Sequence, residues 1–189
     1  MSTAKRLHYA YDDYLALLDQ AAIKLEYCEG VIYAMAGGTP AHAELSAAAI
    51  ALLRGALPEG CRVYSSDLKV RIEATDLSTF PDASVVCGGL AASALDANAV
   101  TNPSILVEVS SRSTEDYDRG DKLSHYKQIP ALRAVIFVAH REARVTVVER
   151  ATAGWDEREV RAGEVVGLRS PAVTFAVDDL YRGVVLDAR

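Results

Sequence analysis

The chain has 189 residues, and half of them are apolar, which suits one α/β domain with a substantial core and excludes a disordered chain. Its 20 Lys and Arg residues against 26 Asp and Glu residues give a net charge of −6. No basic run occurs, so the sequence lacks the electrostatic pattern of a protein that grips DNA through phosphates alone. No uncharged run is long enough to span a bilayer, and no apolar signal segment follows Met1. We therefore expect a cytoplasmic protein with no membrane partner.

The three cysteines, Cys28, Cys61 and Cys87, are scattered through apparent strands, and no Cys-x-x-Cys pair occurs. An odd number with this spacing indicates buried thiols in a reducing compartment rather than a disulfide framework or a zinc site.

The first third of the chain alternates between helical and strand patterns. Tyr11, Tyr14, Leu15 and Leu18 are spaced as i, i+3, i+4 and i+7, which predicts an amphipathic helix over about 10–20. Apolar runs at 24–28 and 31–35 flank a Glu-Gly turn and predict a β-hairpin. A Thr-Pro pair at 39–40 is typical of a helix start, and that helix extends to about residue 57.

The remainder reads mainly as strands. Alternating runs predict strands at 62–66 and 68–72, and a polar loop leads to a strand at 80–86. After a loop of small residues comes a strand at 105–110, then a helix from about 113 to 129, where Pro130 follows. Strands are predicted at 134–139, 145–150 and 155–161, and a helical turn at 178–181. The order predicts a single α/β (mixed α+β) domain over 1–189, with a central mixed sheet flanked by helices.

Two of these strands each carry a carboxylate with no opposite charge beside it. In the later strand Ile105, Val107 and Val109 alternate with Leu106, Glu108 and Ser110, so that Glu108 and Ser110 share one face. If the strand of Asp82 is its neighbour, the Asp82 and Glu108 side chains converge, and two like charges in a partly dry site require a cation between them. The alternative is that Asp82 is a turn residue and Glu108 faces solvent.

Helical periodicity places two further polar residues on inward faces. Over 115–129, Lys122 falls on the stripe of Leu123, Tyr126 and Ile129; Arg119 lies at its edge, and Asp118, Asp121, His125 and Gln128 point away. Lys122 either lays its methylenes on the core with its ammonium in solvent, or returns to the acidic pair. His42 shares a face with Leu45, Ala49 and Leu53, and is either a core or capping histidine or a substrate or metal contact.

Taken together, these segments resemble the PD-(D/E)XK nuclease superfamily, specifically its Uma-type restriction-endonuclease-like branch. The resemblance spans Tyr14 to Tyr181 and is carried by Glu26 to Gly30, Thr39 to Leu45, Pro81-Asp82, Val107 to Thr114, and Tyr117 to Lys122 with Tyr126.

The resemblance implies a restriction-endonuclease-like core in which Glu26, Asp82 and Glu108 bind Mg²⁺ or Mn²⁺. The superfamily lysine is expected at position 110, where this chain has Ser110, and Lys122 on the following helix is the matching residue. The main-chain carbonyl of Val109 is a further candidate ligand, and His42, Ser110 and Tyr126 are candidate substrate or supporting residues.

The predicted function is hydrolysis of DNA phosphodiester bonds by a homodimer in which a metal activates water and Lys122 stabilises charge. No Gly-x-Ser-x-Gly elbow or P-loop occurs, and Ser110 has no base near it in sequence. Two alternatives remain: a non-catalytic nucleic-acid or protein-interaction module on the same scaffold, and a metal-independent hydrolase that uses Asp82 and Glu108 as an acid/base pair.

Overall fold

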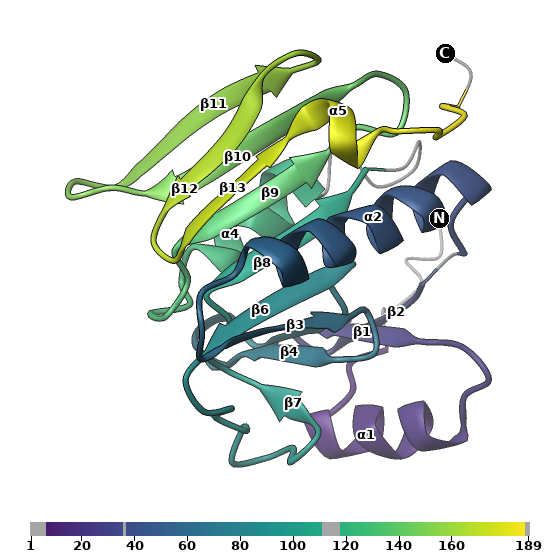
Figure 1. Ribbon diagram of the computed structural model, residues 1–189. Helices are drawn as coiled ribbons and strands as arrows, with labels where there is room; N and C mark the ends of the chain where they lie inside the picture. The colour runs from purple at the N-terminus through teal and green to yellow at the C-terminus, as the bar shows by residue number, and fades with distance from the viewer. Residues whose placement is uncertain (1–6, 36, 111–117, 188–189) are drawn as a thin grey trace.

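The structure, a computed structural model, describes residues 7–35, 37–110 and 118–187. Its strands form a large sheet, a small sheet and a separate hairpin, and helices cover the sheet faces (Figure 1). The fold class is therefore mixed α/β with mixed sheets flanked by helices, as the sequence predicts. Among the described residues, no helix is long and apolar enough to cross a membrane.

The large sheet contains the strand of Glu108 near its middle. Its order is β11 (Trp155–Arg161), β10 (Arg144–Arg150), β9 (Ala134–Val138), β8 (Ile105–Val109), β6 (Ala83–Cys87) and β3 (Cys61–Ser65). β8 runs parallel to β9 and antiparallel to β6, with Ala83 opposite Val107. β8 is buried along its whole length, which explains its nearly continuous apolar sequence.

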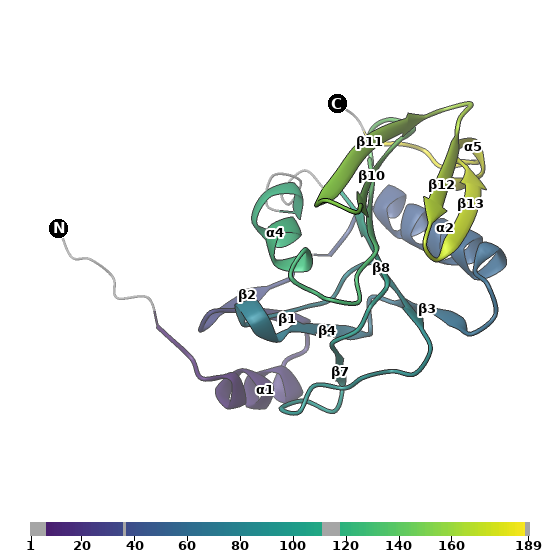
Figure 2. The ribbon, with the colours of Figure 1, turned by 90° about the vertical axis from the view of Figure 1, so that its left-hand side faces the viewer.

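The small sheet is set at an angle to the large one (Figure 2). Its order is β2 (Val31–Ala34), β1 (Leu25–Cys28), β5 (Leu77–Thr79), β4 (Lys69–Ile72) and β7 (Ala99–Val100), and a 3₁₀ turn, η1 (Glu73–Thr75), precedes β5. The π-helical turn η2 (Asp118–Lys122) and the helix α4 (Leu123–Tyr126) lie in the angle between the sheets. Tyr126 and Ile129 pack there with Val70 of the small sheet and Leu106 of the large sheet. One apolar cluster thus joins the two sheets.

The helix α2 (Pro40–Ala56) covers the opposite face of the large sheet. Thr39 caps its N-terminus, Pro40 occupies the first turn, and Leu45, Ala49 and Leu53 are buried at helical spacing. These three residues belong to a second apolar cluster, which also includes the hairpin of β12 (Val165–Arg169) and β13 (Ala172–Ala176) and the short helix α5 (Val177–Leu180).

The helix α1 (Tyr11–Gln20) packs on the outer face of the small sheet. Tyr11 and Tyr14 contact Tyr27 of β1, with ring centroids 5.3 Å apart in each pair. The guanidinium of Arg71 lies 4.0 Å from the Tyr11 ring centroid and forms an ion pair with Asp76. A cation over an aromatic face adds to the apolar packing and holds this helix against the sheet.

The main differences from the predicted elements concern short and late strands. β5 and η1 occupy the predicted polar loop, β7 lies in the predicted loop of small residues, and the β12–β13 hairpin was not predicted. The predicted helix start at 113–117 lies outside the described residues, and α4 ends at Tyr126 with turns up to Ile129.

The prediction of three free thiols is wrong for Cys61 and Cys87, which form a disulfide. The two residues are directly opposite each other in the antiparallel pair of β3 and β6, so their side chains share a face. Spacing in the sequence gives no sign of this pairing, because 26 residues separate them. Cys28 is the free cysteine of the described residues. The cysteines therefore give no support to the expectation of a reducing compartment.

Replacing both Cys61 and Cys87 by Ser should lower the free energy of unfolding by about 3 kcal/mol, because the bond closes a loop of 26 residues in the unfolded chain. Urea denaturation under oxidising conditions measures this difference. The matched control is Cys28→Ser, which removes a half-buried thiol without opening a loop and should change stability much less. Equal midpoints for the double variant and the parent would contradict the prediction.

Candidate functional site

Asp82 and Glu108 lie at the end of the large sheet where β6 begins and β8 ends. Ala83 is paired with Val107, so the same register places Asp82 opposite Glu108. Oδ2 of Asp82 accepts a hydrogen bond of 2.7 Å from the main-chain N–H of Val109. The sequence-based expectation that their strands are neighbours is therefore confirmed by the strand order.

The other oxygen of Asp82 is held from the opposite layer. His42, in the first turn of α2, places its Nε2 2.9 Å from Oδ1 of Asp82. This hydrogen bond raises the pKa of His42, against the lowering effect of burial. The imidazole packs over Gly38, where an added Cβ would lie 2.5 Å from its Cδ2. His42 is therefore bonded to Asp82, and its contact with substrate or metal stays a prediction.

Lys122 is the centre of a buried ionic cluster, which we call the Lys122 cluster: Lys122, Glu26, Glu108 and Asp118. Its Nζ lies 3.1 Å from Glu108, 3.3 Å from Glu26 and 3.5 Å from Asp118, and 5% of its side chain is exposed. Glu26 comes from β1 and Glu108 from β8, so the cluster joins the small and large sheets. Lys122 returns to the acidic residues and does not extend into solvent.

Two hydroxyl groups complete the surroundings of these carboxylates. The Tyr126 hydroxyl donates to Oε1 of Glu108, and the Thr79 hydroxyl donates to Oε1 of Glu26. Burial raises the pKa of Tyr126 well above its usual value, so the phenol remains protonated and acts as a donor. Tyr126, predicted as a substrate or supporting residue, contacts Glu108 directly. The contact of Thr79 with Glu26 could not be predicted from the sequence, because it depends on the pairing of β1 with β5.

The Lys122 cluster contains more carboxylates than ammonium groups. Burial raises the pKa of Glu108 to about 8; Lys122 acts to lower it, and Asp118 and Asp82 act to raise it. Burial acts to lower the pKa of Lys122, but Glu108 and the other acids facing it hold that pKa well above the usual value. Near neutral pH Lys122 is therefore charged and Glu108 carries a proton, which relieves the repulsion between acids.

Asp118 is a correction to the helical-wheel argument, which pointed it away from the core. Its side chain is buried beside Lys122. The reason is the π-helical geometry of residues Asp118–Lys122, whose i→i+5 bonds give a wider turn than an α-helix. Each residue then advances by less than 100°, and Asp118 swings across Lys122 to the buried side.

Ser110 has a base beside it in space, although none is near in sequence. Its Oγ lies 2.9 Å from Nδ1 of His140, which follows the end of the parallel neighbour β9. Both side chains are buried, so this pair is not presented to a substrate as a serine nucleophile. Lys69 is a second buried lysine, but it pairs with Asp96 at 2.6 Å near Tyr14, under α1 rather than at this site.

The donor types at the site suit a hard divalent cation. Mg²⁺ and Mn²⁺ prefer oxygen ligands, and Asp82, Glu108 and Glu26 supply carboxylates that exceed the local positive charge. Among the described residues, however, no three Asp, Glu, His or Cys side chains are arranged to hold one ion together. The reason is visible in the contacts: Glu26 and Glu108 both engage Lys122, and Asp82 engages His42.

Comparison with known proteins assigns this chain to a family. The family model described as "Uma2: Putative restriction endonuclease" matches residues 11–178, a range that includes the Lys122 cluster, His42 and Asp82. The chain belongs to the Uma2 family. Two relatives from Synechocystis sp. are similar along much of their length. The uncharacterized protein slr1290 is 34% identical over 92% of this chain and 91% of its own length, and the uncharacterized protein sll1609 is 31% identical over 67% and 72%.

A solved structure confirms the fold of this Uma2 chain. It is described as a putative nuclease belonging to DUF820 from Anabaena variabilis, and it matches with a TM-score of 0.73 over 92% of this chain and 98% of its own. The two sequences are 17% identical, so the likeness concerns the fold. Family and fold together indicate a nuclease scaffold of the restriction-endonuclease type.

The raised pKa of Glu108 predicts a specific pH dependence of stability. In the unfolded chain this carboxyl titrates near its ordinary value of 4.5, and in the folded protein near 8. The stabilisation is therefore complete below pH 4.5 and is lost as the pH rises through 8, with a limiting slope of about 1.4 kcal/mol per pH unit. Glu108→Gln should remove this part of the slope, as measured by urea denaturation from pH 5 to 9.

The matched control for this measurement is Glu59→Gln, because Glu59 is exposed in the turn after α2. It should keep the slope of the parent protein. A Glu108→Gln variant that loses stability between pH 5 and 8 as steeply as the parent would show that Glu108 does not bind the proton.

Proposed function

We propose that this protein is a divalent-metal-dependent nuclease that hydrolyses phosphodiester bonds of DNA. The observation that carries the proposal is the Lys122 cluster beside Asp82: buried acids from two sheets, in excess over one lysine, at the end of neighbouring strands. Membership of the Uma2 family supports the same reaction class. Such an excess of buried negative charge favours a cation.

In this proposal Asp82, Glu108 and Glu26 hold Mg²⁺ or Mn²⁺, with the Val109 carbonyl as a further ligand. When bound, the ion supplies positive charge that polarises the phosphodiester and lowers the pKa of water. Metal binding requires Glu108 to lose its proton, so affinity should rise with pH up to about 8. The Val109 N–H and His42 keep Asp82 oriented.

Lys122 has two roles in this proposal. Without metal its ammonium pairs with Glu26 and contacts the protonated Glu108. If those carboxylates held a metal ion, the Lys122 ammonium would be free to stabilise charge developing on the phosphate oxygens of the substrate. Tyr126, which donates to Glu108, fixes the position of that carboxylate.

One observation favours a second candidate, a non-catalytic interaction module on the nuclease scaffold. Lys122 already contacts Glu26 and Glu108, two of the acids that would bind metal, and a buried ion-pair cluster whose polar atoms are hydrogen-bonded can persist without any metal ion. Metal binding separates the two candidates. Calorimetric titration of the protein with Mn²⁺ should give a defined site if it is a nuclease and none if it is a module.

The variant Lys122→Met should keep the fold, because methionine preserves most of the aliphatic packing beside Tyr126. Mn²⁺ affinity should persist or rise, since a positive charge near the carboxylates is removed. Cleavage of DNA with Mn²⁺ should fall by roughly 10²- to 10³-fold, the loss expected for one preorganised charge stabiliser. Asp82→Asn should abolish both binding and cleavage.

The control is Lys127→Met, which removes a half-buried lysine just after α4 and outside the cluster. It should cleave like the parent protein. An active parent whose Lys122→Met variant cleaves equally fast would refute the role of Lys122, whereas a parent that neither binds Mn²⁺ nor cleaves DNA would refute the function itself.

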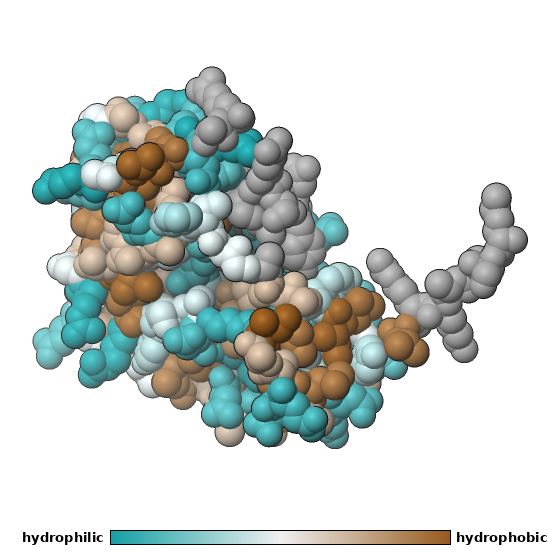
Figure 3. Space-filling view, turned by 90° about the vertical axis from the view of Figure 1, so that its right-hand side faces the viewer, coloured by the Kyte–Doolittle hydropathy of each residue, from teal (hydrophilic) through white to brown (hydrophobic). Residues whose placement is uncertain are grey.

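We further propose that the nuclease is a homodimer, since cutting both strands of a duplex requires two sites. Exposed apolar side chains at α1, the following loop and β2 suit a contact between copies: Leu17, Ile23 and Tyr33. Figure 3 shows apolar residues gathered on the lower part of the molecule, where α1 and β2 lie. Light scattering should give twice the mass of one chain; a clean monomer mass at micromolar concentration would count against the dimer.

A further inference from the structure

The end of β8 is surrounded by hydrogen bonds that come from segments far apart in the sequence. The Val109 N–H donates to Asp82, and Asp82 accepts from the His42 ring. The main-chain N–H of His42 donates to Oγ1 of Thr39 at 3.2 Å, and the Thr39 hydroxyl donates to Oδ2 of Asp187 at 2.8 Å. The site therefore connects, bond by bond, to the C-terminal segment of the chain.

The same segment leads back to β8 by a second route. The main-chain N–H of Asp187 donates to the carbonyl of His140 at 3.1 Å, and the His140 N–H donates to Oγ of Ser110 at 3.3 Å. The Ser110 hydroxyl also lies 2.9 Å from Nδ1 of His140. Because Ser110 directly follows Val109, the hydrogen bonds form a closed ring, which we call the Asp187 ring.

We propose that Asp187 is a positioning residue of the candidate site, which holds the Asp82 carboxylate in place through Thr39 and His42. This role rests on the proposed function only in so far as Asp82 binds the metal. Asp187 itself touches neither Asp82 nor the Lys122 cluster in any hydrogen bond or ion pair described above. It acts through the start of α2.

The Thr39 hydroxyl explains how one carboxylate fixes the helix start. A hydroxyl has one hydrogen and two lone pairs, so Thr39 donates to Asp187 and accepts from the His42 N–H at the same time. Asp187 thus selects the Thr39 rotamer that caps α2, and its negative charge at the positive end of the helix is favourable. Because His42 lies in this first turn, a fixed helix start also fixes the position of its Cα and Cβ atoms.

The imidazole of His42 transmits this position to Asp82 with little freedom. Asp82 accepts hydrogen bonds at both carboxylate oxygens, so Nε2 of His42 carries the hydrogen. The imidazole packs closely against Gly38, since a Cβ added to Gly38 would lie 2.5 Å from Cδ2 of His42, and this contact limits rotation of the ring. Hydrogen bonds in series polarise one another, so loss of one weakens the next.

The experiment compares Asp187→Ala with Asp187→Asn by NMR in the full chain without metal. In Asp187→Ala the Thr39 hydroxyl loses its acceptor, and we expect the His42 ring signals to shift and the Val109 amide to exchange about 10-fold faster. In Asp187→Asn the amide oxygen still accepts, so both signals should remain close to those of the parent. Asp178→Ala is the matched control, because Asp178 is exposed and accepts from the Gly163 N–H, outside the ring.

Unchanged His42 and Val109 signals in Asp187→Ala would overturn the proposal, and equal changes in the Ala and Asn variants would overturn its hydrogen-bond mechanism. In a parent protein that cleaves DNA with Mn²⁺, Asp187→Ala should lower kcat about 10-fold with KM within about 2-fold, and Asp187→Asn should restore it. A parent without Mn²⁺ binding refutes the proposed nuclease, and the NMR comparison still decides the role of Asp187.

Discussion

The structure depends on the burial of several carboxylates around one ammonium group at the junction of two sheets. Glu26 and Glu108 come from different sheets, and Lys122 contacts both. Removing charged groups from water is costly, and an ion pair in the interior returns that cost only when its geometry is good and its remaining polar atoms are hydrogen-bonded. The Tyr126 and Thr79 hydroxyls meet this condition. The angle between the sheets is consequently set by polar contacts as well as by the apolar packing around α4.

Local sequence patterns identified most of the parts of this site but not their partners. Alternation gave the strand of Glu108, and helical periodicity turned Lys122 inward, because both depend only on neighbours along the chain. Asp118 was misplaced because a π turn cannot be read from a periodicity of 3.6 residues. The Thr79 and His140 contacts depend on strand pairing over long separations, which a single sequence does not encode locally.

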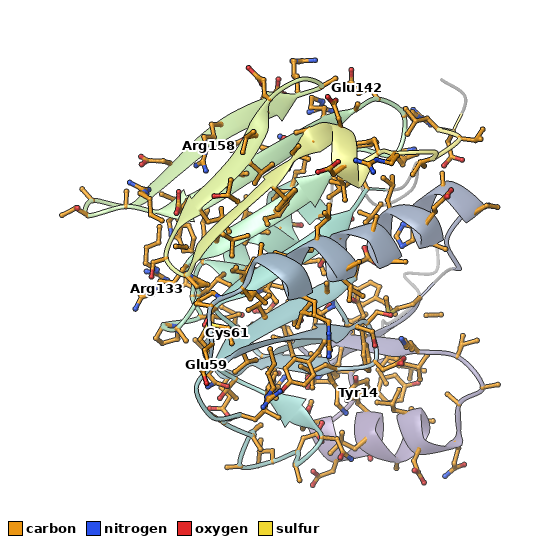
Figure 4. The ribbon with its side chains drawn as sticks, in the orientation of Figure 1. Tyr14, Glu59, Cys61, Arg133, Glu142 and Arg158 are labelled. Atoms are coloured by element: carbon orange, nitrogen blue, oxygen red, sulfur yellow. A yellow bond between two sulfur atoms is a disulfide. The ribbon has the colours of Figure 1, made fainter. Side chains whose placement is uncertain are left out.

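The fold itself was predictable to a similar degree, and for the same reason. Long amphipathic or alternating segments, such as α2 and β10, were recognised from pattern alone. The β12–β13 hairpin was not, although its strands are as long as β8, and its place against α2 is decided by tertiary packing. The Cys61–Cys87 bond is likewise a product of register between β3 and β6. In Figure 4, Cys61 lies at the opposite side of the molecule from the start of α2.

This disulfide leaves the protein with one free thiol, that of Cys28. The sequence contains three cysteines, and two of them are consumed by the bond, so a thiol reagent applied without reductant has Cys28 as its target. Cys28 is half-buried on β1, two residues after Glu26, with its sulfur 3.8 Å from Nε2 of His125 in α4. Burial raises the pKa of this thiol, so labelling at neutral pH should be slow and should accelerate whenever the small sheet and α4 separate. The natural sequence therefore carries its own reporter of motion at the junction of the two sheets.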